Sequence, residues 1–161
     1  MKRILITGCQ RSGTTLMGLI MDSHPLIINV DEADFKSVND LSTELHSCAK
    51  LPQVSADVDY IKNEFKADTI IWMVRNPFDV IKSMLSLHIK RSRTVTESWA
   101  STYSHVEISR ILQYLPNKYL SKFDALINRY RSILSQGGLR ETDHGMIVSA
   151  VTCWVLKQLG L

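Results

Sequence analysis

The stretch Arg3-Ile4-Leu5-Ile6-Thr7-Gly8-Cys9-Gln10-Arg11-Ser12-Gly13-Thr14-Thr15 decides the fold. Its first five residues are rich in branched apolar side chains and stop at a glycine, which predicts a buried strand over 3–7. Apolar residues with helical spacing follow over 14–23, and a proline comes soon after them. A strand, a glycine-bounded loop and a helix in this order are typical of a phosphate-binding loop.

The loop itself favours an anion. Backbone N–H groups of such a loop point into a concavity, and the N-terminus of the next helix adds unpaired N–H groups and its dipole. Thr14 stands where an ATP-binding loop has its lysine, so ATP and GTP are disfavoured. Arg11 supplies a cation that suits a single 5′-phosphate carrying a short anionic group. A glycine-rich turn that binds nothing is the less favoured alternative.

The rest of the chain predicts an α/β fold with a small parallel sheet flanked by helices and a helical C-terminal half. Two further strands are expected, over 26–30 and 69–74. Helices are expected over about 38–49, 57–66, 77–88, 96–115 and 117–136, with a last one around Trp154. A basic loop with His88, Lys90, Arg91 and Arg93 is expected over 88–96.

A second anion site is expected where the strand over 69–74 ends. Arg75 follows this strand directly, and Ser83 lies two turns into the helix that begins at Pro77. An arginine fork with a hydroxyl makes a good phosphate site. The alternative is that Arg75 pairs with Asp79 and that Ser83 is an ordinary surface serine.

Length and charge place further bounds on function. The 161 residues suggest one domain. The net charge of +3 suits an anionic small molecule but is too weak to predict nucleic-acid binding. Cys9, Cys48 and Cys153 are widely spaced, which predicts neither a disulfide framework nor a metal site. We expect a cytoplasmic protein with no stable membrane insertion, because neither a secretory signal nor a run of about 20 apolar residues is visible.

The two motifs together resemble those of the sulfotransferase family. Residues 8–17 look like the loop that holds the 5′-phosphosulfate, and Arg75-Asn76-Pro77-Phe78-Asp79 with Ser83 looks like the 3′-phosphate motif. Asp22-Ser23-His24-Pro25 is typical of the bacterial and tyrosylprotein branch. The resemblance covers residues 1–30 and 69–90 well and the remainder loosely. The chain is short for this family, so a single domain over 1–161 that could be a shortened version of the family's is expected.

This resemblance implies transfer of a sulfuryl group from 3′-phosphoadenosine 5′-phosphosulfate, without a metal, to a small-molecule, carbohydrate or protein acceptor. Its nucleotide-binding residues would be Gln10, Arg11, Ser12, Gly13, Thr14, Thr15, Arg75 and Ser83. Arg11 would steady the departing group, and Glu32, after the second strand, would be the general base. Asp31 or a histidine remains an alternative base, and Glu32 could be a solvated surface carboxylate.

Two other functions stay open. A P-loop nucleotide or small-molecule kinase is disfavoured, because the loop lysine is missing and the strand over 69–74 ends in Arg75 rather than an acidic residue. A non-catalytic module that keeps the nucleotide pocket is the other alternative. It is suggested by the short chain and by Asn128-Arg129-Tyr130-Arg131-Ser132, which matches a later family motif only faintly.

Overall fold

The computed structural model describes residues 1–90, 96–98, 100, 103–114, 117–136 and 143–158. The chain forms two compact units, Met1–Arg75 and Asn76–Leu161, and each is described by itself. The first unit is an α/β layer and the second is mainly helical, so the predicted α/β class and helical C-terminal half are confirmed.

The first unit is built on a four-stranded parallel sheet with the order β2-β3-β1-β4. The strands are β1 (Arg3–Gly8), β2 (Ile27–Val30), β3 (His46–Lys50) and β4 (Thr69–Met73). Central β1 lies between β3 and β4. The connection that leaves β1 passes β3 to reach β2 at one edge, and the connection that leaves β3 passes β1 in the opposite direction to reach β4 at the other edge. The carboxyl end of β1 is therefore the point where an open sheet of this kind binds its ligands.

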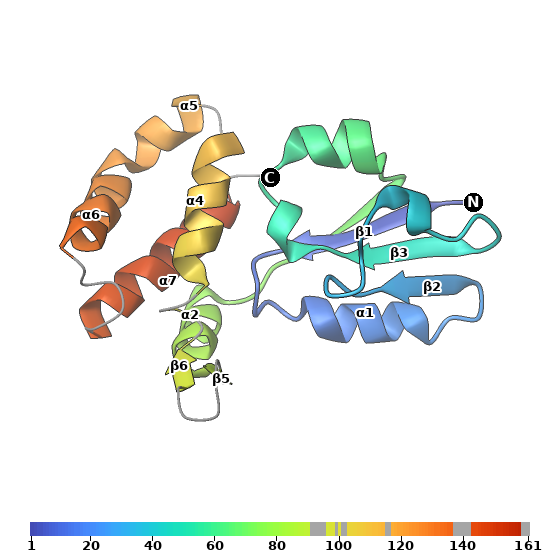
Figure 1. Cartoon of the computed structure of the whole chain (residues 1–161), viewed down its shortest axis with the longest axis horizontal. Coiled ribbons are helices and arrows are strands. Elements are labelled where there is room, and N and C mark those ends of the chain that lie inside the picture. The colour runs from blue at the N-terminus through green and yellow to red at the C-terminus, as the bar shows by residue number, and fades with distance from the viewer. Residues whose placement is uncertain (91–95, 99, 101–102, 115–116, 137–142, 159–161) are drawn as a thin grey trace. The chain divides into compact units, whose positions relative to one another are not determined.

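Both faces of the sheet are covered by helices (Figure 1). On one face, α1 (Thr14–Asp22) packs Met17 and Met21 against Ile4 and Ile6 of β1. On the other face, Leu5 meets Ile61 and Phe65 of the π-helix Tyr60–Phe65. The alternation of β1 side chains between the faces follows from the two-residue period of a strand.

The segment over 38–49 was predicted as a helix, and this prediction is wrong. It holds one 3₁₀ turn, Val38–Asp40, and then β3. None of the five β3 residues is β-branched, so local preference does not favour a strand. Neighbours on both sides impose it, because β3 hydrogen-bonds with β1 and with β2. The fourth strand of the sheet was missed for this reason.

Other predicted elements are confirmed with small shifts. β2 and β4 match the strands expected over 26–30 and 69–74, and the helix expected over 57–66 is the π-helix. β4 is an edge strand, and Ile70 on it is 47% exposed.

The second unit packs helices around α7 (Asp143–Gln158). Those that contact it are α2 (Pro77–Ser86), α4 (Ser104–Tyr114) and α6 (Asp124–Ser135). Short α5 (Asn117–Leu120) and the 3₁₀ turn Ser121–Phe123 precede α6. The helix expected over 96–115 is found in part as α4, but Thr96–Ser98 form β6, which pairs with β5 (His88–Lys90). Part of the expected basic loop is thus strand, and Arg91 and Arg93 lie outside the described residues.

Candidate anion-binding site

The glycine loop runs from the carboxyl end of β1 to the first turn of α1, as predicted. Gly13 caps α1 with φ of 101° and no side-chain hydrogen bond to the helix N-terminus. Within the loop, the backbone N–H of Ser12 donates to the carbonyl of Cys9 at 3.2 Å, and the Ser12 hydroxyl donates to the same carbonyl. The loop is therefore folded tightly on itself, with the amino end of a nine-residue helix directly behind it.

Gly8 is required by its contact with the neighbouring strand. Its φ is 123°, a conformation that L side chains rarely adopt, and a Cβ atom would lie 2.4 Å from the carbonyl oxygen of Met73. Gly8 pairs with Met73 in the sheet. The absence of a side chain thus lets the loop leave β1 while β4 remains close beside it.

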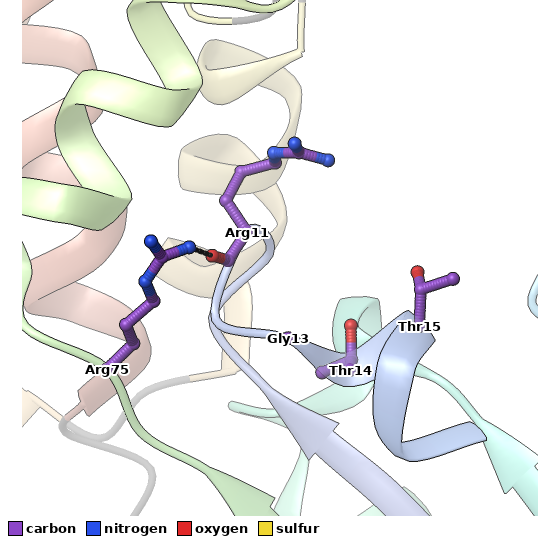
Figure 2. A pocket seen from close by; sticks show the side chains of 5 residues that line it. All are labelled: Arg11, Gly13, Thr14, Thr15 and Arg75. Carbon is purple, nitrogen blue, oxygen red and sulfur yellow. Dashed lines mark hydrogen bonds between the residues drawn. The ribbon is translucent and has the colours of Figure 1, made fainter. Parts of the chain in front are cut away.

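Five residues of the first unit line a pocket of about 210 Å³ at the loop, and Figure 2 shows them: Arg11, Gly13, Thr14, Thr15 and Arg75. Arg75 comes from the segment after β4, and its Nη1 donates to the carbonyl oxygen of Arg11 at 3.4 Å. The arginine expected at a second anion site therefore lies against the loop, and its contact here is to backbone. Two guanidinium groups and the helix N-terminus favour an anion of phosphate or sulfate size.

Arg11 stands at the tip of the loop in a strained backbone conformation. Its φ is 69°, and among the described non-glycine residues only Lys66 shares a positive φ. The left-handed region costs an ordinary residue about 1–2 kcal/mol. Its side chain is exposed, so the loop presents this cation to solvent at the pocket.

Lys50 is a functional candidate that the sequence reasoning missed. It ends β3, and its side chain is 5% exposed. Its Nζ lies 3.0 Å from Oδ2 of Asp31, 3.3 Å from Oε1 of Glu32 and 3.4 Å from Oγ1 of Thr15. We call these four residues the Lys50 cluster. Thr15 belongs both to this cluster and to the pocket lining.

The register of the parallel sheet assembles the cluster. Val30 pairs with Ala49, so Asp31 and Lys50 are the next residues at the same edge. Ile6 pairs with Lys50, which brings the end of β3 beside the start of the loop. The sequence signal for this cluster is the acidic pair after β2, followed by a lysine 18 positions after Glu32. Recognising it required knowing that β3 exists.

Asp31 is held as a carboxylate by this arrangement. Burial raises its pKa, but hydrogen bonds from Lys50 and from the backbone N–H of Ala33, with the Lys50 charge, outweigh burial. The net pKa of Asp31 lies below its ordinary value of 3.8. Glu32, the predicted base, is 41% exposed and reaches the loop through Lys50 rather than by lining the pocket.

The remaining predicted residues have less direct outcomes. Gln10 is half-buried in the loop and is not among the residues that line the pocket. Ser83 lies on α2 in the second unit, whereas Arg75 belongs to the first, so their pairing stays a prediction. His24 accepts the backbone N–H of Leu26 at 3.2 Å, as expected of a residue in a helix-ending turn.

Comparisons with protein-family models, curated proteins and solved structures found no match. In the described part of the chain, no helix is both long and apolar enough to cross a bilayer. Among those same residues, no group of three or more histidine, cysteine, aspartate or glutamate side chains is placed to hold a metal ion. The site's own chemistry therefore carries the functional argument.

Proposed function

We propose that this protein is a sulfotransferase that uses 3′-phosphoadenosine 5′-phosphosulfate as donor and an acceptor hydroxyl or amine. One observation carries the proposal: a tight loop at the carboxyl end of β1 gathers Arg11, Arg75 and the N-terminus of α1 around a small pocket. The loop lacks the lysine that an ATP-binding loop directs at the β- and γ-phosphates. A single phosphate bearing a transferable sulfuryl group suits it better than a triphosphate.

Binding of the donor would rely on groups already in place. Backbone N–H groups of residues 13–15 and the hydroxyls of Thr14 and Thr15 would hold the 5′-phosphate. Arg75 would turn its fork from the Arg11 carbonyl to the nucleotide, with Ser83 as the predicted partner at the 3′-phosphate. Unlike Arg75, the loop N–H groups would need no large reorganisation when charge develops.

Transfer would then move one sulfuryl group in line. The acceptor oxygen or nitrogen forms a bond to sulfur as the bond between sulfur and the bridging oxygen of the 5′-phosphate breaks. The electron pair of that bond stays on the phosphate, where Arg11 offsets the developing charge. In the proposal, Oε2 of Glu32 takes the acceptor proton while Oε1 remains on Lys50. A neutral hydroxyl needs such a base to react efficiently.

The contact of Glu32 with Lys50 is the observation that favours the second candidate, a non-catalytic nucleotide-binding module. An ion-paired carboxylate is less available as a base than a solvated one. Under this alternative, the loop would bind the nucleotide and the carboxylates would serve only to hold Lys50.

Calorimetry tests nucleotide choice first. We expect 3′-phosphoadenosine 5′-phosphate to bind without metal, and Arg75→Lys to weaken binding about tenfold by removing the fork. Lys62→Ala, on the exposed side of the π-helix, is the matched control and should bind normally. A clear preference for Mg·ATP would reject both the sulfotransferase and the binding module in favour of a kinase.

A sulfate-transfer assay over a panel of phenol, sugar and peptide acceptors then separates the two remaining functions. Glu32→Gln should retain nucleotide binding and lose about 100-fold or more in turnover. Full activity in this variant would exclude Glu32 as the base. Nucleotide binding with no transfer to any acceptor class would favour the binding module.

A further inference from the structure

The Lys50 ammonium lies at the centre of a set of oxygen atoms. An ammonium has three N–H donors, and the hydroxyl of Thr15 and the carboxylates of Asp31 and Glu32 all approach within 3.4 Å. The lysine side chain is 5% exposed, whereas both carboxylates are about 40% exposed. The positive charge is therefore the enclosed member of the cluster, and the oxygens surround it from the solvent side.

This set of ligands is the kind that a divalent cation takes at a phosphate-binding loop. Hydroxyl and carboxylate oxygens are preferred by Mg²⁺, which in ATP-binding loops uses the hydroxyl of the residue after the lysine. Thr15 is that residue by position, because it follows Thr14 at the lysine position. In this chain the hydroxyl is directed to Lys50 instead.

We propose that the Lys50 ammonium takes the place of a divalent metal, so that the loop binds its anion with a cation built into the chain. This deepens the proposed function, because it rests on anion binding by the loop, although not on sulfuryl transfer. Lys50 reaches the pocket edge through Thr15, and its ion pairs with Asp31 and Glu32 hold the ammonium in place. Metal independence would thus be determined by β3 and not by the loop sequence alone.

The charges of the Lys50 cluster predict what happens when the ammonium is removed. With Lys50 present, one positive charge faces two carboxylates. Removal of the ammonium leaves two adjacent carboxylates and a hydroxyl with no cation among them, and their exposed side allows water and a metal ion to enter. The oxygens would close inward by roughly 1 Å to reach Mg²⁺ ligand distances near 2.1 Å, which partly exposed side chains can do.

The test measures Mn²⁺ binding by electron paramagnetic resonance, without nucleotide, in Lys50→Met and in the unaltered protein. Methionine keeps the apolar stem and removes the charge. We expect Lys50→Met to bind Mn²⁺ at least about tenfold more tightly than the unaltered protein. Adding Asp31→Asn and Glu32→Gln to it should abolish the gain. Lys62→Met, an exposed lysine of the same unit, is the matched control and should bind as the unaltered protein does.

Equal Mn²⁺ binding by folded Lys50→Met and the unaltered protein would overturn the proposal. A second measurement needs no variant: binding of inorganic phosphate to the unaltered protein, followed by ³¹P NMR in EDTA and in Mg²⁺. Equal affinity in the two buffers supports a built-in cation, and a tenfold or greater dependence on Mg²⁺ refutes it. Because neither probe is a nucleotide, failure of the sulfotransferase proposal would be seen separately, in the calorimetry.

Discussion

The contact between Gly8 and β4 gives the most decisive test of how the loop is built. In Gly8→Ala, the new Cβ would lie 2.4 Å from the Met73 carbonyl oxygen, so the strands must separate by about 1 Å to restore an ordinary contact of 3.4 Å. That movement disrupts the pairing of Gly8 with Met73 at the end of the sheet. Arg75, two residues after Met73, would shift away from the loop at the same time.

The expected loss of stability has two parts. A non-glycine residue at φ of 123° costs about 1–3 kcal/mol, and overpacking against backbone adds about 1–3 kcal/mol. We therefore expect Gly8→Ala to lower the free energy of unfolding by about 2–6 kcal/mol. Urea denaturation followed by circular dichroism measures this directly.

The chain offers the same chemical change as a control. Gly18 lies inside α1, where the atoms nearest to an added Cβ belong to the flexible Asn29 side chain, the first at 3.1 Å. Alanine is favoured over glycine in a helix by about 0.5–1 kcal/mol, which offsets this tight contact. Gly18→Ala should thus remain within about 1 kcal/mol of the unaltered protein. A Gly8→Ala variant as stable as Gly18→Ala would refute the steric account of the loop.

Three further predictions concern the loop, the acidic cluster and a buried thiol. Arg11→Gly should stay within about 1 kcal/mol of the unaltered protein in urea denaturation, because relief of the left-handed backbone offsets the added entropy of the unfolded chain. Calorimetry should nevertheless show about tenfold weaker binding of 3′-phosphoadenosine 5′-phosphate. Normal binding would contradict a role for the Arg11 guanidinium. The lowered pKa of Asp31 contributes stability above pH 3.8 that is lost as pH falls through the folded-state pKa. In Asp31→Asn, stability followed by circular dichroism should therefore depend less on pH below about pH 4. An unchanged pH dependence would count against the Lys50 contact. Burial raises the pKa of the Cys48 thiol to about 12. Mass spectrometry should therefore find this cysteine unmodified by iodoacetamide at pH 8 until urea unfolds the protein. Rapid labelling in native buffer would show that β3 is not buried as described.

The elements that the sequence predicts correctly are those whose signals lie in consecutive residues. β1, the glycine loop and α1 follow from branched apolar side chains, two glycines and helical spacing. The end of β4 and the start of α2 follow from an apolar run and an Asn-Pro start, where the Asn76 side chain accepts the Phe78 N–H at 2.9 Å. Each signal is local, so an isolated sequence contains it.

The site could be predicted only where its residues directly follow a strand that the sequence reveals. The loop and Arg75 line one pocket as expected, because the loop follows β1 and the arginine follows its neighbour β4. Glu32 was chosen by its place after β2. Its actual partner, Lys50, was not seen, since the strand that carries the lysine gave a helical prediction.

The sequence by itself therefore determined an anion loop without its usual lysine, because glycine positions and helix starts are properties of neighbouring residues. Only the tertiary structure decided that β3 enters the sheet between β1 and β2. A strand of weak local preference forms there because hydrogen bonds on both sides stabilise it. That insertion sets Lys50 beside Thr15, Asp31 and Glu32, so a lysine from elsewhere in the chain lies next to a loop whose own lysine position holds Thr14.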